Sequence, residues 1–357
     1  MTGRDPGPDR DDDAGGDDGG GRPEPWAQVV DDDLDALVHG ADLDGLVRMI
    51  DDRSSVRDWD GLMRVRDRSR RAVDTGRQLW PAATLAEYRL ALHAPPAHVA
   101  AVLDETDGSS GRFTIGPLTE VVAQEHTWAE LVDHLDPGPR SSFVAHERAL
   151  RGEVVDDRAL APVLDITTTP APWEPAYPLA TYRDEGAEFP SPELPDDWVE
   201  LAATPDAELL DDDVDAALRH LVEPWTTSSN GRVESSCVVG GAAEAIGALG
   251  VRRARICSLT APTALAWIAW AGASGGAHGR RRGAAAGRYG TWWLLAALGD
   301  LLDDWPVGGV ELGELVAQLR WSRWDAFEPD VGWSLRIAVE DPDEHVAWAL
   351  HAQDASS

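Results

Sequence analysis

The sequence predicts a mainly α-helical protein with a small α+β part in its C-terminal half. Three observations support this fold class. Apolar residues recur at helical spacing throughout residues 26–165, the segment Trp333–Glu340 alternates apolar and polar residues, and the apolar stretch Thr260–Trp305 is interrupted by one glycine- and arginine-rich turn. Spacings of three and four residues indicate amphipathic helices, whereas a period of two indicates a half-buried strand.

The charge of the chain is strongly negative. It has 357 residues, enough for two or three domains, and 64 acidic residues against 31 basic ones, which gives a net charge of −33. Every one of these basic residues is arginine, so the sequence excludes Schiff-base chemistry on lysine and a P-loop lysine. The negative charge also predicts that neither nucleic acid nor an anionic membrane is a partner.

Several features point to a cytoplasmic protein without a metal or a cofactor. The two cysteines, Cys237 and Cys257, are too few for a disulfide framework, and the acidic, glycine-rich N-terminus does not resemble a signal peptide. No apolar run reaches the length of a membrane span without a charge or a glycine-rich break. Because the ten histidines are scattered, no metal site is expected, and no motif indicates a cofactor.

Composition and breakers divide the chain into four expected segments. The first lacks large apolar residues after Met1, and the third contains eight of the nine prolines that lie from Pro162 to Pro205. The second is expected to contain stacked helical pairs in a solenoid-like arrangement, with an ordinary irregular helical domain as the alternative. The segments are a disordered acidic arm (1–25), a helical domain (26–165), a proline-rich linker or wrap (166–205) and an α+β domain with the arginine-rich turn (206–354).

Periodicity predicts the individual elements. The helical domain begins with two helices around Leu34–Val38 and Leu43–Ile50. Its later helices are expected at Trp59–Val73, Ala82–His93, Ala97–Leu103, Pro117–Ala123, Trp128–Leu135 and Phe143–Leu150. In the C-terminal half we expect helices at Asp211–Leu221 and Ala242–Leu249, and strands at Arg232–Val239, Arg253–Leu259, Leu319–Phe327, Trp333–Glu340 and Val346–Ala352.

The arginine-rich turn is the candidate site. Between Arg232 and Gly290 the sequence has eight arginines and two acidic residues. A first helix is expected to begin at the N-cap Thr260 and a second to run from about Arg280 to Asp303, with a short antiparallel sheet around these two apolar helices. Arginines at the N-terminus of that second helix face the positive end of its dipole, which costs about 0.3–1 kcal/mol each when exposed.

An anion would offset that cost, because backbone N–H groups, the helix dipole and guanidinium groups would all converge on it. We therefore predict an anion site that consists of His278, Arg280, Arg281, Arg282 and Arg288. Three sources of the anion remain open: a phosphate or carboxylate ligand, an acidic segment of a partner protein, and the protein's own surface. For the last source, Asp303–Asp304 and Asp211–Asp213 are the candidates.

The tryptophans near the turn have two interpretations. The second helix is apolar on nearly all sides, with Trp292 and Trp293 among its residues, so it is expected to be buried against Trp267 and Trp270 of the first helix. The alternative is a platform on which a base or another planar ring stacks, together with an arginine. Packing in the core is the interpretation that aromatic residues at helical spacing favour.

Enzyme motifs are weak in this sequence. Gly272–Gly276 fits the G-x-S-x-G pattern, but an alanine-rich helix precedes it where a nucleophile elbow needs a strand. We therefore predict no catalytic residue, and whether the protein is an enzyme stays open. The first hypothesis is a non-catalytic binding or scaffold protein. The alternative is a hydrolase or transferase that acts on a phosphorylated or carboxylated small molecule, with Ser274 or His278 reacting.

One resemblance extends beyond single motifs. The stretch SGGAHGRRRGAAAGR, residues 274–288, resembles the signature of an uncharacterised protein family of high-GC actinobacteria, together with Trp321–Trp324, Gly332–Arg336 and Val346–Trp348. The resemblance covers the C-terminal third well and the helical half loosely. The domain of that family has no known function, so the resemblance implies no activity and no residue roles.

Overall fold

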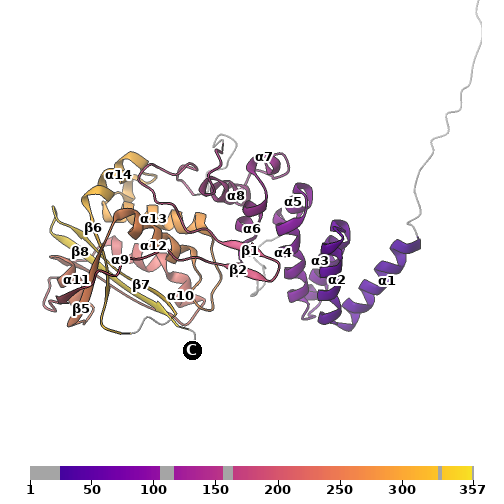
Figure 1. Ribbon diagram of the computed structural model, residues 1–357, viewed down its shortest axis with the longest axis horizontal. Helices are drawn as coiled ribbons and strands as arrows, with labels where there is room; N and C mark the ends of the chain where they lie inside the picture. Colours follow the sequence, from indigo (N-terminus) through magenta and orange to yellow (C-terminus); the bar gives the residue numbers. More distant parts are fainter. Residues whose placement is uncertain (1–24, 105–115, 156–163, 329–331, 356–357) are drawn as a thin grey trace, which may run out of the picture.

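The computed structural model describes residues 25–104, 116–155, 164–328 and 332–355. Within these ranges the chain forms 14 α-helices, a six-stranded antiparallel sheet and a two-stranded sheet. The architecture is therefore mixed α+β, which corrects the expected mainly α-helical class. Apart from Pro25, the predicted acidic arm lies outside the described residues. The molecule is elongated, with α1–α8 at one end and the six-stranded sheet with its covering helices at the other (Figure 1).

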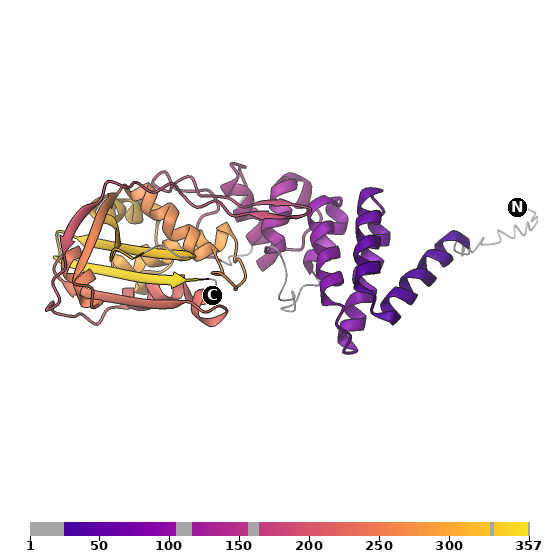
Figure 2. The ribbon, with the colours of Figure 1, turned by 60° about the horizontal axis from the view of Figure 1, so that its bottom comes forward.

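The first half of the chain is a row of helices around one apolar core. Figure 2 shows α2, α3 and α4 side by side, roughly across the long axis of the molecule. Asp42 and Asp58 cap α2 and α3, because their carboxylates accept hydrogen bonds of 2.9 Å from the N–H groups of Gly45 and Gly61. The bounds are α1 Pro25–Gly40, α2 Leu43–Ser55, α3 Trp59–Asp74, α4 Trp80–His93, α5 Pro96–Asp104, α6 Leu118–Glu125, α7 Trp128–Leu131 and α8 Pro139–Leu150.

The proline-rich segment packs against both halves of the molecule: Tyr182 joins the core of the helical half, and Ile166 and Trp173 pack on the core of the sheet half. It contains a small hairpin, β1 (Thr181–Arg183) and β2 (Gly186–Glu188), that its composition did not predict. The hydroxyl of Tyr88 donates to the carbonyl of Arg183 at 2.6 Å. Gln124 exchanges two hydrogen bonds with the backbone of Tyr182, at 2.6 and 3.0 Å. These bonds hold the hairpin on α4 and α6.

The sheet in the second half is larger than the short sheet that the sequence predicts. Its strand order is β3-β5-β6-β7-β8-β4, and all neighbouring strands are antiparallel. Five strands match predicted ones, and β3 comes from the end of the proline-rich segment. The bounds are β3 Val199–Ala202, β4 Arg232–Val239, β5 Arg253–Leu259, β6 Arg320–Asp325, β7 Trp333–Asp341 and β8 Val346–Asp354.

Helices cover both faces of this sheet. One face packs against a core that includes Leu335, Ile337 and residues of α9, α12 and α13, and the other face carries α11. Trp292 is 1% exposed and belongs to this core, as the sequence indicates. The bounds are α9 Asp213–Leu221, α10 Glu223–Thr227, α11 Ala242–Ala248, α12 Ala261–Ala273, α13 Ala284–Leu298 and α14 Gly309–Gln318. In the described part of the chain, no helix has the length and apolar composition needed to cross a membrane.

Candidate functional site

The arginine turn forms the connection between α12 and α13. Helix α13 begins at Ala284 and ends at Leu298, so the predicted helix from Arg280 to Asp303 was too long at both ends. The helix begins later than predicted because Gly283 has a φ of 98°, which is outside the helical region. A Cβ at that position would also lie 2.9 Å from Oε1 of Glu147. The three consecutive arginines therefore precede the helix instead of forming its first turn.

Arg281 is bound to a carboxylate of the helical half. Its Nε and Nη2 donate to Glu120 at 2.7 and 2.9 Å, and both side chains are almost fully buried. The hydroxyl of Tyr182 donates to the same carboxylate at 2.6 Å. Burial acts to raise the pKa of Glu120, but the hydrogen bonds and charge of Arg281 hold it below its usual value. Glu120 is therefore an ionised internal partner of Arg281.

The first N–H groups of α13 are also occupied from within the protein. Ala284 donates to Glu120 at 3.2 Å, and Ala285 donates to Glu147 at 2.7 Å. Burial and the nearby charge of Glu120 raise the pKa of Glu147 to about 7, although Arg151 lies 3.0 Å from its carboxylate. The protein's own surface thus supplies the acceptors at this helix start. They come from α6 and α8, not from the two aspartate runs considered in the sequence.

Arg288 lies one turn further along α13 and contacts a different carboxylate. Its Nε and Nη2 donate to the two oxygens of Glu174 at 2.6 and 2.7 Å. Its Nη1 donates to the carbonyls of Thr167 and Thr168 at 2.7 and 3.2 Å. Arg288 is fully buried, so these bonds fix the start of the proline-rich segment against α13.

The remaining predicted residues do not join a shared pocket. His278 is exposed, and its backbone N–H donates to Oγ of Ser229 at 3.0 Å. Arg280 is exposed and Arg282 is half-buried, with a pKa that burial lowers. Ser274 is buried and accepts from the N–H of Gly276 at 2.9 Å. Among the described residues, no hydrogen bond joins Ser274 to His278.

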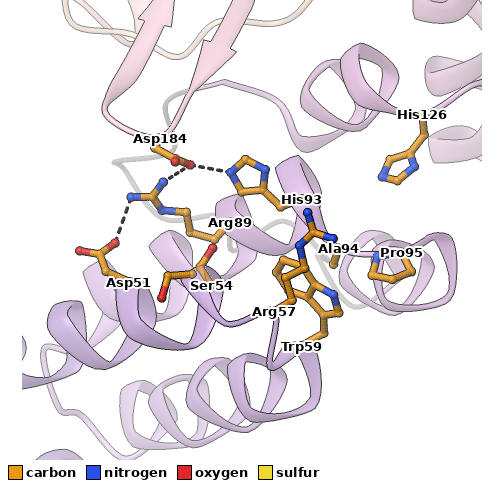
Figure 3. Close-up of a pocket in the computed structure, with 11 residues that line it drawn as sticks. Asp51, Ser54, Arg57, Trp59, Arg89, His93, Ala94, Pro95, His126 and Asp184 are labelled. Carbon is orange, nitrogen blue, oxygen red and sulfur yellow. Dashed lines mark hydrogen bonds and ion pairs between the residues drawn. The ribbon is translucent and has the colours of Figure 1, made fainter.

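A concave pocket of about 560 Å³ lies instead on the helical half (Figure 3). It forms where the end of α2, the end of α4 and the turn before α7 meet the tip of the β1–β2 hairpin. The ends of these elements lie close together because the helices pack side by side and end on the same side of the helical half. Its polar and aromatic lining consists of Asp51, Ser54, Ser55, Arg57, Trp59, Arg89, His93, His126 and Asp184.

Four of these side chains form a connected network. Arg89 donates to Asp51 at 3.0 Å and also contacts Asp184, which accepts from His93 at 2.6 Å. Burial acts to raise the pKa of Asp184, but His93 and Arg89 hold it below its usual value. Figure 3 shows the network as a continuous row of dashed lines. The network thus combines two aspartates with one arginine and one histidine.

Arg57 differs from the other cations in this pocket. Within the described part of the chain its exposed side chain has no hydrogen bond and no ion pair, and no dashed line reaches it in Figure 3. Its φ is 59°, a left-handed conformation that costs a residue with a Cβ about 1–2 kcal/mol. Arg57 directly follows the C-cap of α2, and the N–H of Asp58 donates to the carbonyl of Arg53 at 2.9 Å, so this conformation belongs to the turn that ends the helix.

His126 is the second group with unused hydrogen-bonding capacity. Its Nε2 is enclosed and has no hydrogen-bond partner among the described residues. Burial lowers the pKa of this ring, so it is neutral near pH 7. Sequence reasoning missed both Arg57 and His126, because neither lies in a recognisable motif and the pocket depends on how helix ends align.

Comparison with models of known protein families found a match. Residues 44–356 match a family described as "Family of unknown function (DUF6183)". The match includes most of the helical half as well as the sheet, so it extends well beyond the C-terminal third. No curated protein and no solved structure matches the chain.

Proposed function

Because the chain belongs to the DUF6183 family, whose function is unknown, we propose a function from the geometry of the molecule itself. The protein is a non-catalytic binding protein of the cytoplasm, and its helical half holds an anionic ligand or an acidic segment of a partner. The row of helices acts as a solenoid-like scaffold for the pocket in Figure 3. This proposal places ligand binding away from the arginine turn.

The proposal rests mainly on the exposed guanidinium of Arg57, which has no ion pair among the described residues. In the same pocket Arg89, by contrast, pairs with both Asp51 and Asp184. The pocket volume of about 560 Å³ lies within the roughly 300–1,000 Å³ of small-molecule sites. Trp59 supplies an aromatic wall, and His126 supplies a further polar atom. A carboxylate or phosphate group satisfies Arg57 best, because its oxygens match the guanidinium fork.

The net charge of −33 opposes the approach of any anion, but salt limits this effect. At physiological ionic strength the Debye length is about 8 Å, so exposed charges further away than this are largely screened. The charges that line the pocket therefore dominate binding. In this proposal the arginine turn serves the same function indirectly, because Arg281 pairs with Glu120 of α6 and so holds the two halves of the molecule together.

Calorimetric titration tests this function. The probes are tripolyphosphate and a hexaglutamate peptide, in a buffer of 0.15 M ionic strength. Arg57→Gly removes the guanidinium and at the same time relieves the left-handed strain, so weaker binding cannot be attributed to a damaged fold. Arg232→Ala, an exposed arginine on β4 at the other end of the molecule, is the matched control.

We expect the wild type and Arg232→Ala to bind at least one probe with equal affinity. Arg57→Gly should bind it about tenfold more weakly, which corresponds to the net free-energy contribution of about one hydrogen bond to a charged group. Equal affinity of Arg57→Gly and the wild type would rule out the pocket as the anion site.

A further inference from the structure

The six-stranded sheet opens on one side between β6 and β7. Arg320–Arg323 of β6 pair with Ile337–Glu340 of β7, and this pairing ends at Arg323 and Ile337. Beyond that point Trp324 and Asp325 pair only with β5, and the beginning of β7 pairs only with β8. The indole N–H of Trp324 donates to the carbonyl of Ile337 at 3.3 Å and closes the narrow end of the opening.

A cavity of about 240 Å³ lies at this opening. It is smaller than the roughly 300–1,000 Å³ of sites for drug-sized ligands, so it suits a molecule of one or two rings. Four tryptophans line it. Two come from α12, one from the segment before β3 and one from β6: Trp267, Trp270, Trp198 and Trp324.

The aromatic side chains are held in place before any ligand binds. Trp270 stacks on Trp333, with ring centroids 4.9 Å apart and an angle of 21° between the planes. The guanidinium groups of Arg323 and Arg255 lie 4.2 and 4.6 Å from the ring centroid of Trp198. Such fixed rings lose little conformational entropy when a planar ligand packs against them.

Two polar groups among these walls have unused donors. Arg255 pairs with Asp325 at 2.7 Å, but the guanidinium of Arg323 has no hydrogen bond and no ion pair in the described part of the chain. The indole N–H of Trp270 is enclosed and has no hydrogen-bond partner among the same residues. A buried donor without a partner is unfavourable, so a ligand that accepts a hydrogen bond there is favoured.

We propose that this cavity binds a small aromatic carboxylate, with its ring among the tryptophan side chains and its carboxylate on Arg323. Aromatic walls alone would also suit a quaternary ammonium group. However, Arg323 lines the cavity and repels a cation, whereas Asp325 is matched by Arg255 and Arg336 is matched by Glu328. This site lies in the sheet half and involves none of the residues of the pocket on the helical half.

Calorimetric titration with matched ligands tests the site. Indole-3-carboxylate, indole-3-carboxamide and tryptamine share one ring system but carry a negative charge, no charge and a positive charge. The variants are Arg323→Ala, which removes the carboxylate partner, and Arg323→Lys, which keeps the charge. Arg320→Ala is the control, because Arg320 lies three residues away on the same strand, is exposed and does not line the cavity.

The wild type and Arg320→Ala should bind the carboxylate about tenfold more tightly than the carboxamide, and tryptamine least tightly. Arg323→Ala should lose that tenfold preference while still binding the carboxamide, which shows that the cavity is intact, and Arg323→Lys should keep part of it. No binding of the carboxylate by the wild type at millimolar concentration would overturn the proposal. An unchanged preference in Arg323→Ala, or tighter binding of tryptamine, would overturn it as well.

Discussion

At the residue scale, Arg281 of the arginine turn and Arg288 of α13 are bound to carboxylates inside the protein. Arg281 and Glu120 are 161 positions apart in the sequence, and Arg288 and Glu174 are 114 apart. The concentration of arginines pointed to an anion, and the structure pairs Arg281 and Arg288 with two internal carboxylates. Spacing along the chain could not identify the partners, because only the packing of α6, α8 and the proline-rich segment against α13 brings them together.

The pair of Arg281 and Glu120 gives a prediction about stability. Arg281→Ala leaves a buried carboxylate without its cation, and breaking such a pair costs about 3–5 kcal/mol. Arg219→Ala breaks an exposed pair with Asp215 and should cost less than about 1 kcal/mol. Urea unfolding followed by circular dichroism measures both changes in the free energy of unfolding. Similar small losses in the two variants would show that the junction contributes little to stability.

Glu147 gives a prediction about pH. Burial and Glu120 raise its pKa from 4.5 in the unfolded chain to about 7 in the folded protein. Between these pH values the folded protein keeps a proton that the unfolded chain releases. The contribution of Glu147 to stability is therefore fully present below about pH 4.5 and is lost as the pH rises through about 7.

Glu147→Gln keeps a neutral side chain of similar shape at every pH. We expect this variant to exceed the wild type in free energy of unfolding by about 2–3 kcal/mol at pH 8 and to approach it at pH 5. Protonation of the other carboxylates lowers the free energy of unfolding in acid. Because both proteins contain these carboxylates, comparing the two proteins at each pH cancels this effect. A difference that is the same at pH 5 and pH 8 would contradict the raised pKa.

At the scale of the elements, periodicity predicted most of the helices and five of the six strands of the large sheet. The helices of the first half matched because each has an apolar face that packs into a common core. The hairpin β1–β2 and strand β3 were missed. They are only three or four residues long and mostly exposed, so pairing with distant residues defines them and no apolar pattern marks them.

The start of α13 gives a prediction at this scale. Gly283 has a φ of 98°, and a Cβ there would lie 2.9 Å from the carboxylate of Glu147. We therefore expect Gly283→Ala to lower the free energy of unfolding by about 1–3 kcal/mol. Gly138 also precedes a helix, but its backbone is extended and no atom lies within 4 Å of the added Cβ. Gly138→Ala should be tolerated in the same urea unfolding assay, and equal losses would show that the Gly283 backbone relaxes freely.

At the scale of the whole molecule, an elongated shape separates two concave sites. The pocket with Arg57 lies on the helical half, and the tryptophan-lined cavity lies in the sheet half. The ion pair of Arg281 with Glu120 joins the two halves. The sequence predicted a helical part and an α+β part in this order. It could not predict either site, because each combines residues from elements that only the tertiary fold brings together.

The central claim is that an anion binds at the helical pocket and not at the arginine turn. Hydrogen–deuterium exchange with and without a saturating anionic probe, tripolyphosphate or hexaglutamate, tests it directly, because binding slows the exchange of amides close to the ligand. The account predicts slower exchange in the peptide that spans Ser54–Trp59, with no change in Ser274–Gly283. Slower exchange confined to Ser274–Gly283 would contradict it.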